Sequence, residues 1–264
     1  GLSFKKLVKM HPSFSQYIIP NTDYHIERSR EALIKYNYYV ARECFDLDIE
    51  FELHKAIIPA IMLRYNFLKY IPLQRHSTVI ELGTGATGIL ALLSAKLFKC
   101  NVIATEIDEE YIKIAQRNIH ANHLEKEITL KNSHGKFLKD VIDPEMRADY
   151  IISNPPYYDE VLENESVWGG EMYELVGHGE YGEKFILRMV EEGIPFLKDG
   201  GVLAFIIPKK RKETLIAIEN HLKNGSYTYN LMGISAGNRI RYIFRIYKIN
   251  PDILKHSEMD FQWK

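Results

Sequence analysis

The sequence has few cysteines and no long apolar run. Cys44 and Cys100 are its two cysteines in 264 residues, and their spacing fits neither a metal site nor a redox motif, so no metal centre is expected. No apolar run reaches the roughly 18 residues that a membrane-spanning helix needs. Residues Leu2–Met10 carry lysines but no uninterrupted apolar core, unlike a signal peptide. A cytoplasmic protein without membrane contact is therefore expected.

The chain also lacks a strong net charge of either sign. Its formal net charge is −1 at pH 7, so no overall basic field points to a nucleic-acid partner. The charge is unevenly distributed: residues 1–76 sum to +3, residues 77–198 to −9 and residues 199–264 to +5. A basic surface could therefore be assembled from the two ends of the chain.

Residues 1–76 are predicted to form a small N-terminal helical module that binds the substrate. Ser29 can cap one helix, and a second helix is expected after Pro59. The residues expected to face inward on these helices are Leu33, Tyr36, Val40, Cys44, Leu63, Phe67 and Tyr70. Aromatic residues are dense here and lie near lysines and arginines, which suits base stacking and phosphate contacts. An ordinary core with a solvated rim would explain them equally well.

Residues 77–264 are predicted to form one α/β domain, because strands and helices alternate along them. The expected strands are 78–82, 101–105, 128–131, 149–153, 201–207, 226–234 and 239–249, and the expected helices are 87–98, 109–121, 182–196 and 213–222. Short crossovers produce a parallel sheet with helices on both faces. The last two strands form a hairpin that adds an antiparallel strand at one edge. This is the Rossmann-like, seven-stranded plan of class I methyltransferases.

A glycine-rich loop follows the first of these strands. Gly83, Gly85 and Gly88 fit the spacing G-x-G-x-x-G, in which glycines allow a tight turn and close backbone approach to a nucleotide-like cofactor. Glu106, at the end of the second strand, can accept hydrogen bonds from both ribose hydroxyls of an adenosyl group. Glu81 holds an acidic position that often faces the methionine end of the cofactor in class I methyltransferases.

Two alternatives concern this cofactor loop. Asp108 could also bind a ribose, but it is expected to begin the next helix, where an acidic residue suits the macrodipole. An NAD-linked dehydrogenase would explain the glycines and Glu106, because dinucleotide-binding folds share the same spacing. That alternative leaves residues 154–157 without a role and does not explain the closing hairpin.

The segment Asn154-Pro155-Pro156-Tyr157 follows the fourth strand, which places it beside the glycine loop. The two prolines fix the backbone and remove N–H donors, so carbonyl groups can point toward a ligand. The Asn154 side-chain oxygen and the Pro155 carbonyl can each accept one hydrogen of an exocyclic NH₂, while Tyr157 offers a stacking face. These four residues are the predicted catalytic residues of an S-adenosylmethionine-dependent methyltransferase that acts on nitrogen, in which positioning supplies most of the catalysis.

Several segments together match one known family. They are LVKMHPSFSQY (7–17), PAIMLRYNFLKY (59–70), ELGTGATGIL (81–90), ATEIDEEYIKIAQRN (104–118), NPPY (154–157), Gly169-Gly170, Lys209-Lys210 and GNRIRY (237–242). With these segments the chain resembles the adenine-N6 RNA methyltransferases, which include a bacterial enzyme for large-subunit ribosomal RNA and the eukaryotic methyltransferase-like 16 proteins. The segment ending in Arg64-Tyr65-Asn66-Phe67 discriminates best, because other Asn-Pro-Pro-Tyr enzymes have no reason to carry it.

The resemblance implies a role for particular residues. The implied cofactor contacts are Arg64, Gly83, Glu106 and Asn154, the implied adenine site is 154–157, and the implied RNA contacts are Lys209, Lys210 and Arg241. Arg239 joins the expected RNA contacts, because Arg239, Arg241 and Arg245 alternate along the last strand and share one face. A phosphate or a loop is the expected partner of that face.

The chain departs from the family pattern at two places. Tyr157 stands where the family usually has Phe, and residues 159–183 carry eight acidic residues without Lys or Arg. An acidic lid would repel phosphates.

The predicted function is therefore N6-adenine methylation of structured RNA, with ribosomal RNA as the expected substrate and a monomer as the expected state. The alternatives are a protein glutamine methyltransferase, which presents the same planar NH₂ to the same motif, and a non-catalytic RNA-binding protein on this fold. The intact glycines and Asn154 disfavour the non-catalytic alternative.

Overall fold

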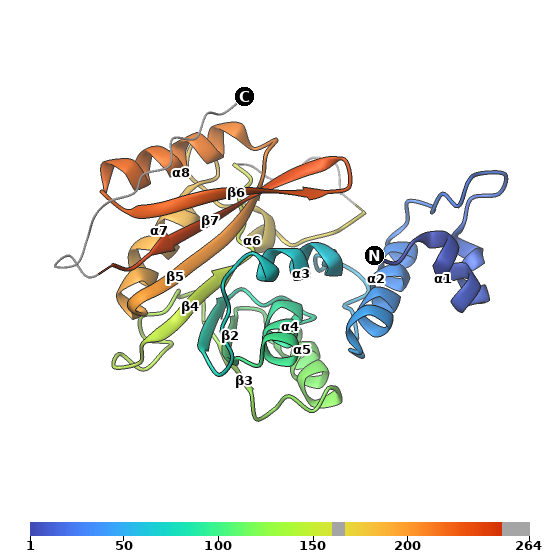
Figure 1. Ribbon diagram of the computed structural model, residues 1–264, viewed down its shortest axis with the longest axis horizontal. Coiled ribbons are helices and arrows are strands. Elements are labelled where there is room, and N and C mark those ends of the chain that lie inside the picture. Colours follow the sequence, from blue (N-terminus) through green and yellow to red (C-terminus); the bar gives the residue numbers. More distant parts are fainter. Residues whose placement is uncertain (160–166, 250–264) are drawn as a thin grey trace.

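The fold is built on a seven-stranded sheet in the order β3-β2-β1-β4-β5-β7-β6 (Figure 1). A computed structural model describes residues 1–159 and 167–249. The strands are β1 Thr78–Leu82, β2 Asn101–Glu106, β3 Ile128–Asn132, β4 Ala148–Ser153, β5 Leu197–Pro208, β6 Thr228–Ala236 and β7 Arg239–Tyr247. Strands β1 to β5 pair in parallel, and β7 is antiparallel to both β5 and β6. The predicted α/β class I methyltransferase plan is confirmed.

The closing hairpin differs from the prediction in one respect. The antiparallel strand β7 lies between β5 and β6, whereas we expected the antiparallel strand at the edge. Phe244 of β7 is paired with Phe205 of β5 on one side and with Leu231 of β6 on the other. The second strand of the hairpin therefore enters the sheet, and the first strand becomes the edge.

Helices cover both faces of the sheet, and each face has its own core. Neighbouring residues of β1 divide between them, since Val79 belongs to one buried cluster and Ile80 to the other, as the alternation along a strand requires. The cluster of Val79 includes residues of α4 Ile89–Phe98 and α5 Glu109–Ala121. That of Ile80 includes α7 Lys184–Gly193 and α8 Lys212–Asn224, with the short helix η2 Ile194–Phe196 packed beside it.

The N-terminal helices extend from the side of the sheet that carries α4 and α5 (Figure 1). They are α1 Phe4–Met10, η1 Pro12–Tyr17, α2 Arg30–Phe45 and α3 Ile61–Lys69. Ser29 caps α2 as predicted, since its hydroxyl accepts a hydrogen bond from Ala32 N at 3.1 Å. The boundary of the predicted module at residue 76 stays a prediction, because buried residues before and after it share one cluster.

The predicted inner face of the N-terminal helices is partly wrong. Val40 and Phe67 are buried, but Cys44 is exposed and Tyr70 is 39% exposed. The Asn37 side chain connects α2 to α3, because its Oδ1 accepts a hydrogen bond from Ile61 N at 3.0 Å. The face of α2 that is buried includes Ala41 and Phe45 in addition to Val40, and Cys44 lies outside it.

The connector between α2 and the main domain is held by side chains at both ends. Asn118 of α5 accepts a hydrogen bond from Glu50 N at 2.8 Å and donates one to Glu50 O at 2.9 Å. Arg30 donates to the carbonyl oxygens of Glu52, Leu53 and Ala56 at 2.7–3.0 Å. These bonds attach the N-terminal helices firmly to the sheet. None of the described helices is long and apolar enough to cross a membrane.

Candidate active site

A cavity of about 420 Å³ lies where β1, β2, β3 and β4 end. Parallel strands that are neighbours bring their carboxyl ends together, and Leu82 of β1 is paired with Ser153 of β4. The loops after both strands therefore line one cavity. Of the predicted site residues, those that line it are Arg64, Glu81, Gly83, Gly85, Glu106, Asn154 and Pro156. Gly88, Pro155 and Tyr157 are adjacent in the chain but are not among the lining residues.

The glycine loop exposes bare backbone to this cavity. Gly83, Gly85 and Gly88 have φ values of +72°, +73° and +69°, a left-handed conformation that other residues rarely adopt. A Cβ atom added at Gly83 or Gly85 would meet no heavy atom within 4 Å. Backbone conformation, not crowding, therefore requires the glycines. Gly88 forms the N-cap of α4.

Glu106 is a buried acid of the cavity that three backbone N–H groups hold in place. It is 4% exposed, and its carboxylate accepts hydrogen bonds from Gly85 N at 3.0 Å, Ile107 N at 2.8 Å and Asp108 N at 3.0 Å. Burial raises its pKa, although these three N–H groups oppose the change. Asp108 begins α5 as predicted, since its Oδ1 accepts hydrogen bonds from Glu110 N and Tyr111 N.

Glu81 and Arg64 bring one acidic and one basic side chain to the cavity wall. Glu81 is 1% exposed and accepts a hydrogen bond from the Thr84 hydroxyl at 2.6 Å. Burial raises the pKa of Glu81 to about 8, and the nearby Glu106 charge adds to the rise. Burial lowers the pKa of the Arg64 guanidinium to about 10, so Arg64 remains charged at neutral pH. A ligand that carries both an ammonium and a carboxylate group matches this pair.

The backbone of Tyr157 and Tyr158 is held by the segment 167–178, which we call the strap. The strap contains the short helix α6 Met172–Leu175. Leu175 O accepts hydrogen bonds from Tyr157 N at 3.1 Å and Tyr158 N at 2.9 Å, and Gly177 N donates to Tyr158 O at 2.8 Å. The Asn154 side chain lines the cavity and has no hydrogen-bond partner among residues 1–159 and 167–249. Its amide is therefore available to a ligand.

Three residues that shape this tip were not predicted from the sequence. A Cβ atom at Gly177 would lie 2.8 Å from Pro156 O, and one at Gly182 would lie 2.0 Å from Tyr157 O. Arg211 donates a hydrogen bond to Tyr157 O at 3.3 Å and lies 5.0 Å from the centre of the Tyr158 ring. The three glycines at 177, 179 and 182 were the available signal, because clustered glycines often mark a close backbone approach.

The four predicted RNA contacts lie close together at one end of the sheet. Burial and the charges of Arg239, Arg241 and Arg211 lower the pKa of Lys210. Arg241 also opposes the burial-driven rise of the Tyr157 pKa to about 12, so the group reaches the Asn154–Tyr157 tip. In the part of the chain that the structure describes, the side chains of this basic cluster have no ion-pair partner. The cluster consists of Lys209, Lys210, Arg239 and Arg241.

Arg245 does not belong to this basic cluster. It donates hydrogen bonds to Asn230 Oδ1 at 2.7 Å and to Tyr70 O at 3.1 Å. We expected either a phosphate or a loop as the partner of the arginine face. For Arg245 the partner is a loop, which it contacts at Tyr70 O.

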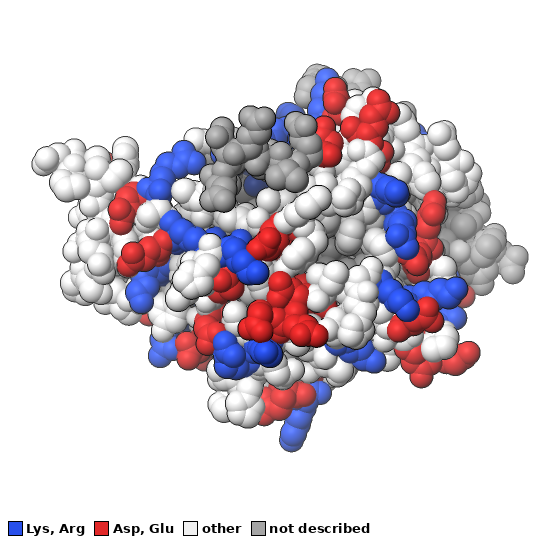
Figure 2. Space-filling view, turned by 180° about the vertical axis from the view of Figure 1, so that it is seen from behind, with Lys and Arg blue, Asp and Glu red and all other residues white. Residues whose placement is uncertain are grey.

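Two of the acidic residues that the structure describes in segment 159–183 lie in ion pairs. Asp159 lies 3.5 Å from Arg211, Glu171 lies 3.4 Å from Lys55, and Glu183 accepts a hydrogen bond from Tyr181 N at 2.8 Å. Glu160, Glu163 and Glu165 lie outside the described residues. On the face seen in Figure 2, acidic and basic side chains are intermixed. Two of the described acids are therefore paired with cations, and the acidic lid stays a prediction.

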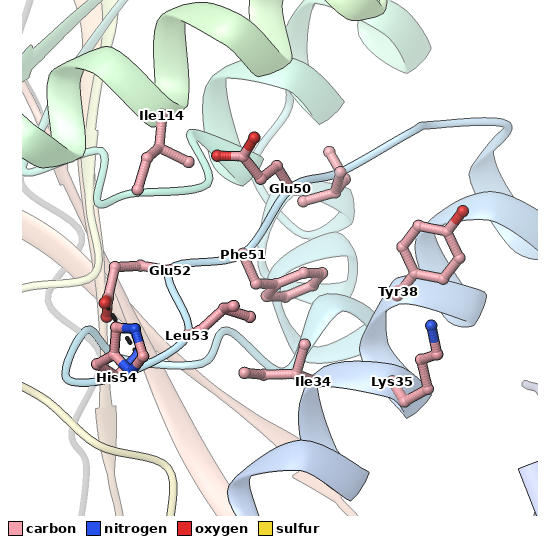
Figure 3. Close-up of a pocket in the computed structure, with 10 residues that line it drawn as sticks. Ile34, Lys35, Tyr38, Glu50, Phe51, Glu52, Leu53, His54 and Ile114 are labelled. Carbon is pink, nitrogen blue, oxygen red and sulfur yellow. Dashed lines mark hydrogen bonds between the residues drawn. The ribbon is translucent and has the colours of Figure 1, made fainter.

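A second groove of about 500 Å³ lies away from these residues. Figure 3 shows residues that line this groove. Phe51 and Leu53 belong to the connector, Ile34 and Tyr38 to α2, and Ile114 to α5. The groove contains none of the predicted site residues. No group of three His, Cys, Asp or Glu side chains that could hold a metal ion occurs among the described residues.

Comparison with known proteins gives a consistent assignment. A family model described as RNA methyltransferase matches residues 2–206. A methyltransferase of Methanocaldococcus jannaschii is 36% identical over 260 residues, which cover 93% of this chain and 98% of that protein. Human METTL16, named an RNA N(6)-adenosine-methyltransferase, is 30% identical over 179 residues, covering 62% of this chain and 32% of that protein.

A solved structure and two more distant relatives extend this comparison. The catalytic domain of human METTL16, in complex with an RNA hairpin, superimposes with a TM-score of 0.79 at 21% identity and covers 97% of this chain and 95% of that one. Ribosomal RNA large subunit methyltransferase F of Christiangramia forsetii is 24% identical over 274 residues, covering 89% of this chain and 92% of that protein. A release factor glutamine methyltransferase of Clostridium acetobutylicum is 27% identical over 218 residues, covering 72% of each.

Proposed function

Because the chain belongs to the RNA methyltransferase family, we propose that it methylates N6 of an adenine in a structured RNA, with S-adenosylmethionine as the methyl donor. The class I fold, the reaction class and the cofactor follow from the family and from structural neighbours, one of which holds S-adenosylhomocysteine. The adenine target and the residue roles below are the proposal. The observation that carries it is the meeting of the glycine loop, Glu106 and Asn154 around one cavity.

The cavity suits the cofactor group by group. Glu106 can accept from the ribose, Gly83 and Gly85 let the ligand approach bare backbone, and Arg64 can bind the carboxylate of the methionine end. Glu81 can bind its ammonium group. The cofactor supplies a methyl group that is already activated by a sulfonium, so the protein needs no general base before transfer.

The target amine is expected at the Asn154 side of the cavity. The Asn154 side-chain oxygen is free of partners within the described residues, and the Pro155 carbonyl is the second acceptor for the NH₂ hydrogens. With both hydrogens held, the nitrogen lone pair faces the methyl group. Tyr157 offers its ring to the base, as aromatic residues do for bases that are turned out of RNA loops.

The basic cluster supports RNA over other substrates. One of its cations, Arg241, acts on Tyr157, and its four side chains have no ion-pair partner in the described residues. Phosphates can therefore serve as their partners. Ribosomal RNA is our proposed class, since a relative that covers most of the chain is named a ribosomal RNA methyltransferase. Action as a cytoplasmic monomer also stays a proposal.

A protein glutamine methyltransferase is the second candidate. A glutamine carboxamide presents the same planar NH₂, and one relative of this class is 27% identical over 72% of the chain. The family match and the basic cluster favour RNA.

The discriminating experiment supplies radiolabelled S-adenosylmethionine together with total cellular RNA and total protein, and then separates the fractions. We expect label in RNA, and none with the Asn154→Ala variant as the matched control. Label in protein that depends on Asn154 would replace RNA with glutamine as the substrate.

A further inference from the structure

The two prolines limit how the protein can hold the Asn154–Tyr157 tip. Pro155 and Pro156 have no N–H group, so neither can donate a backbone hydrogen bond to the surrounding protein. The Asn154 side chain lines the cavity and has no hydrogen-bond partner within the described residues. The backbone of Tyr157 and of the next residue, Tyr158, is therefore where the protein can fix the tip.

The backbone N–H and C=O groups of Tyr157 and Tyr158 all have partners. Three of these four groups bind the strap, since Tyr157 N and Tyr158 N donate to Leu175 O and Tyr158 O accepts from Gly177 N. The fourth group, Tyr157 O, accepts a hydrogen bond from Arg211 Nη2 at 3.3 Å. The strap thus leaves one backbone group of the tip to a side chain from another part of the chain.

Arg211 reaches the tip from the beginning of α8, where its own backbone is fixed. It is the N-cap residue of α8. Its N–H donates to Pro208 O at 3.0 Å, and its carbonyl oxygen accepts from Leu215 N at 3.0 Å. The Arg211 side chain is 22% exposed, and its Nε atom is buried. The guanidinium is therefore directed into the protein, unlike that of a solvated arginine.

The same guanidinium makes two further contacts just after the tip. Its central carbon lies 5.0 Å from the centre of the Tyr158 ring, within the range of a cation–π interaction. Its Nη2 atom lies 3.5 Å from Asp159 Oδ1. One planar group therefore contacts three consecutive residues, 157–159. A lysine would supply the charge without the planar fork of donors.

We propose that Arg211 is a positioning residue for methyl transfer: through Tyr157 O and the Tyr158 ring it holds the tip in the place that transfer requires. The inference rests on the proposed function in that it takes the tip as the site of the target amine. A displaced tip leaves the cofactor bound but misaligns the nitrogen, and a misplacement of about 1 Å can lower a rate about 100-fold. Arg211 thus differs in role from Lys209 and Lys210, although the three are consecutive in the chain.

The test separates positioning from RNA binding by comparing Arg211→Ala with the matched control Lys212→Ala. Lys212 is the next residue, is exposed, and carries the same charge. In Arg211→Ala the single-turnover rate at saturating cofactor and RNA should fall about tenfold. The affinity for RNA, its salt dependence and the affinity for S-adenosylhomocysteine should stay unchanged. Lys212→Ala should keep the full rate. If Arg211→Ala does not fold, Arg211→Met replaces it with the same expectations.

Hydrogen exchange gives a second measurement, which needs no substrate. Because prolines have no N–H, the amide signal of segment 154–158 comes from Asn154, Tyr157 and Tyr158. Exchange in this segment should be about tenfold faster in Arg211→Ala than in the unchanged protein or in Lys212→Ala. Exchange in β4 should not change, which would show that the effect is local.

The proposal is overturned if either the rate at saturating RNA or the exchange of segment 154–158 is the same in Arg211→Ala as in the unchanged protein. A salt slope that decreases by about 1 with an unchanged rate would make Arg211 a phosphate contact instead. Failure of the proposed function would appear differently, as label on a substrate other than adenine with the unchanged protein. The exchange measurement would test Arg211 even then.

Discussion

The cofactor cavity and the basic cluster differ in whether their ionisable side chains have partners within the protein. In the cavity, Glu81, Glu106 and Glu174 are held by hydrogen bonds from the protein itself. In the basic cluster, Lys209, Lys210, Arg239 and Arg241 have no internal anion within the described residues. A buried charge is costly unless protein groups pair with it, whereas a cation in contact with solvent can stay unpaired until a ligand with anionic groups binds. We therefore expect the cavity to bind one small molecule and the basic cluster to bind a polyanion.

The largest effect on methyl transfer is expected from a substitution at Asn154, which lines the cofactor cavity and belongs to the tip that Arg241 of the basic cluster approaches. Asn154→Ala removes an acceptor that positions the target amine, and it should lower the rate of methyl transfer about 100-fold or more. Because the ribose and methionine contacts remain, affinity for S-adenosylhomocysteine should fall less than tenfold. Single-turnover methylation and calorimetry measure the two quantities. Retained transfer in the variant would remove Asn154 from the catalytic residues.

Neutralising the basic cluster should affect RNA and spare the cofactor. Because four cations would no longer pair with phosphates, the slope of log affinity against log salt should decrease by roughly 3, while calorimetry with S-adenosylhomocysteine should give an unchanged affinity. The matched control neutralises four exposed lysines elsewhere, namely Lys99, Lys113, Lys126 and Lys139. If both quadruple variants bind RNA with the same salt slope, the proposed surface is wrong.

Tyr157 should have a smaller effect than either change above. Tyr157→Ala removes a stacking face that is worth roughly 1–3 kcal/mol per base, so kcat/KM on RNA should fall about tenfold or more. Tyr157→Phe keeps the ring and should be nearly silent. A decrease in Tyr157→Phe as large as in Tyr157→Ala would show that the hydroxyl, not the ring, is required.

The smallest expected effect is a pH dependence of cofactor affinity. The raised pKa of Glu81, about 8, means that below pH 8 the empty site mostly holds a proton, which must leave when an ammonium group binds. Affinity for S-adenosylhomocysteine should therefore rise with pH and be about fivefold higher at pH 8 than at pH 7. Glu81→Gln should bind more weakly and lose this dependence. An unchanged slope in the variant would assign the proton to another group.

Much of the cofactor cavity could be predicted because parallel topology follows from the sequence. The glycine loop and the Asn154 segment both follow apolar strands, and adjacent parallel strands necessarily place such loops side by side. The hairpin 228–247 was also predicted, but the position of β7 inside the sheet depends on strand pairing that no local pattern reveals.

What the sequence did not reveal depends on long-range contacts. Glu174 looked like one of eight acids in a charged segment, and only the fold turns it into the cavity beside Tyr111. Arg211 looked like part of a basic run, yet it supports Tyr157. Cys44 fitted a helical stripe, but α2 buries Ala41 and Phe45 beside it, and Cys44 is exposed.

The most direct test of the central claim identifies the methylated nucleoside. RNA modified by the protein with isotope-labelled S-adenosylmethionine is digested to nucleosides and analysed by mass spectrometry, with Asn154→Ala run in parallel. We expect the label in N6-methyladenosine and its absence with the variant. Label on guanine, on ribose, or on a glutamine of a co-incubated protein would contradict an adenine site formed by Asn154, Pro155, Pro156 and Tyr157.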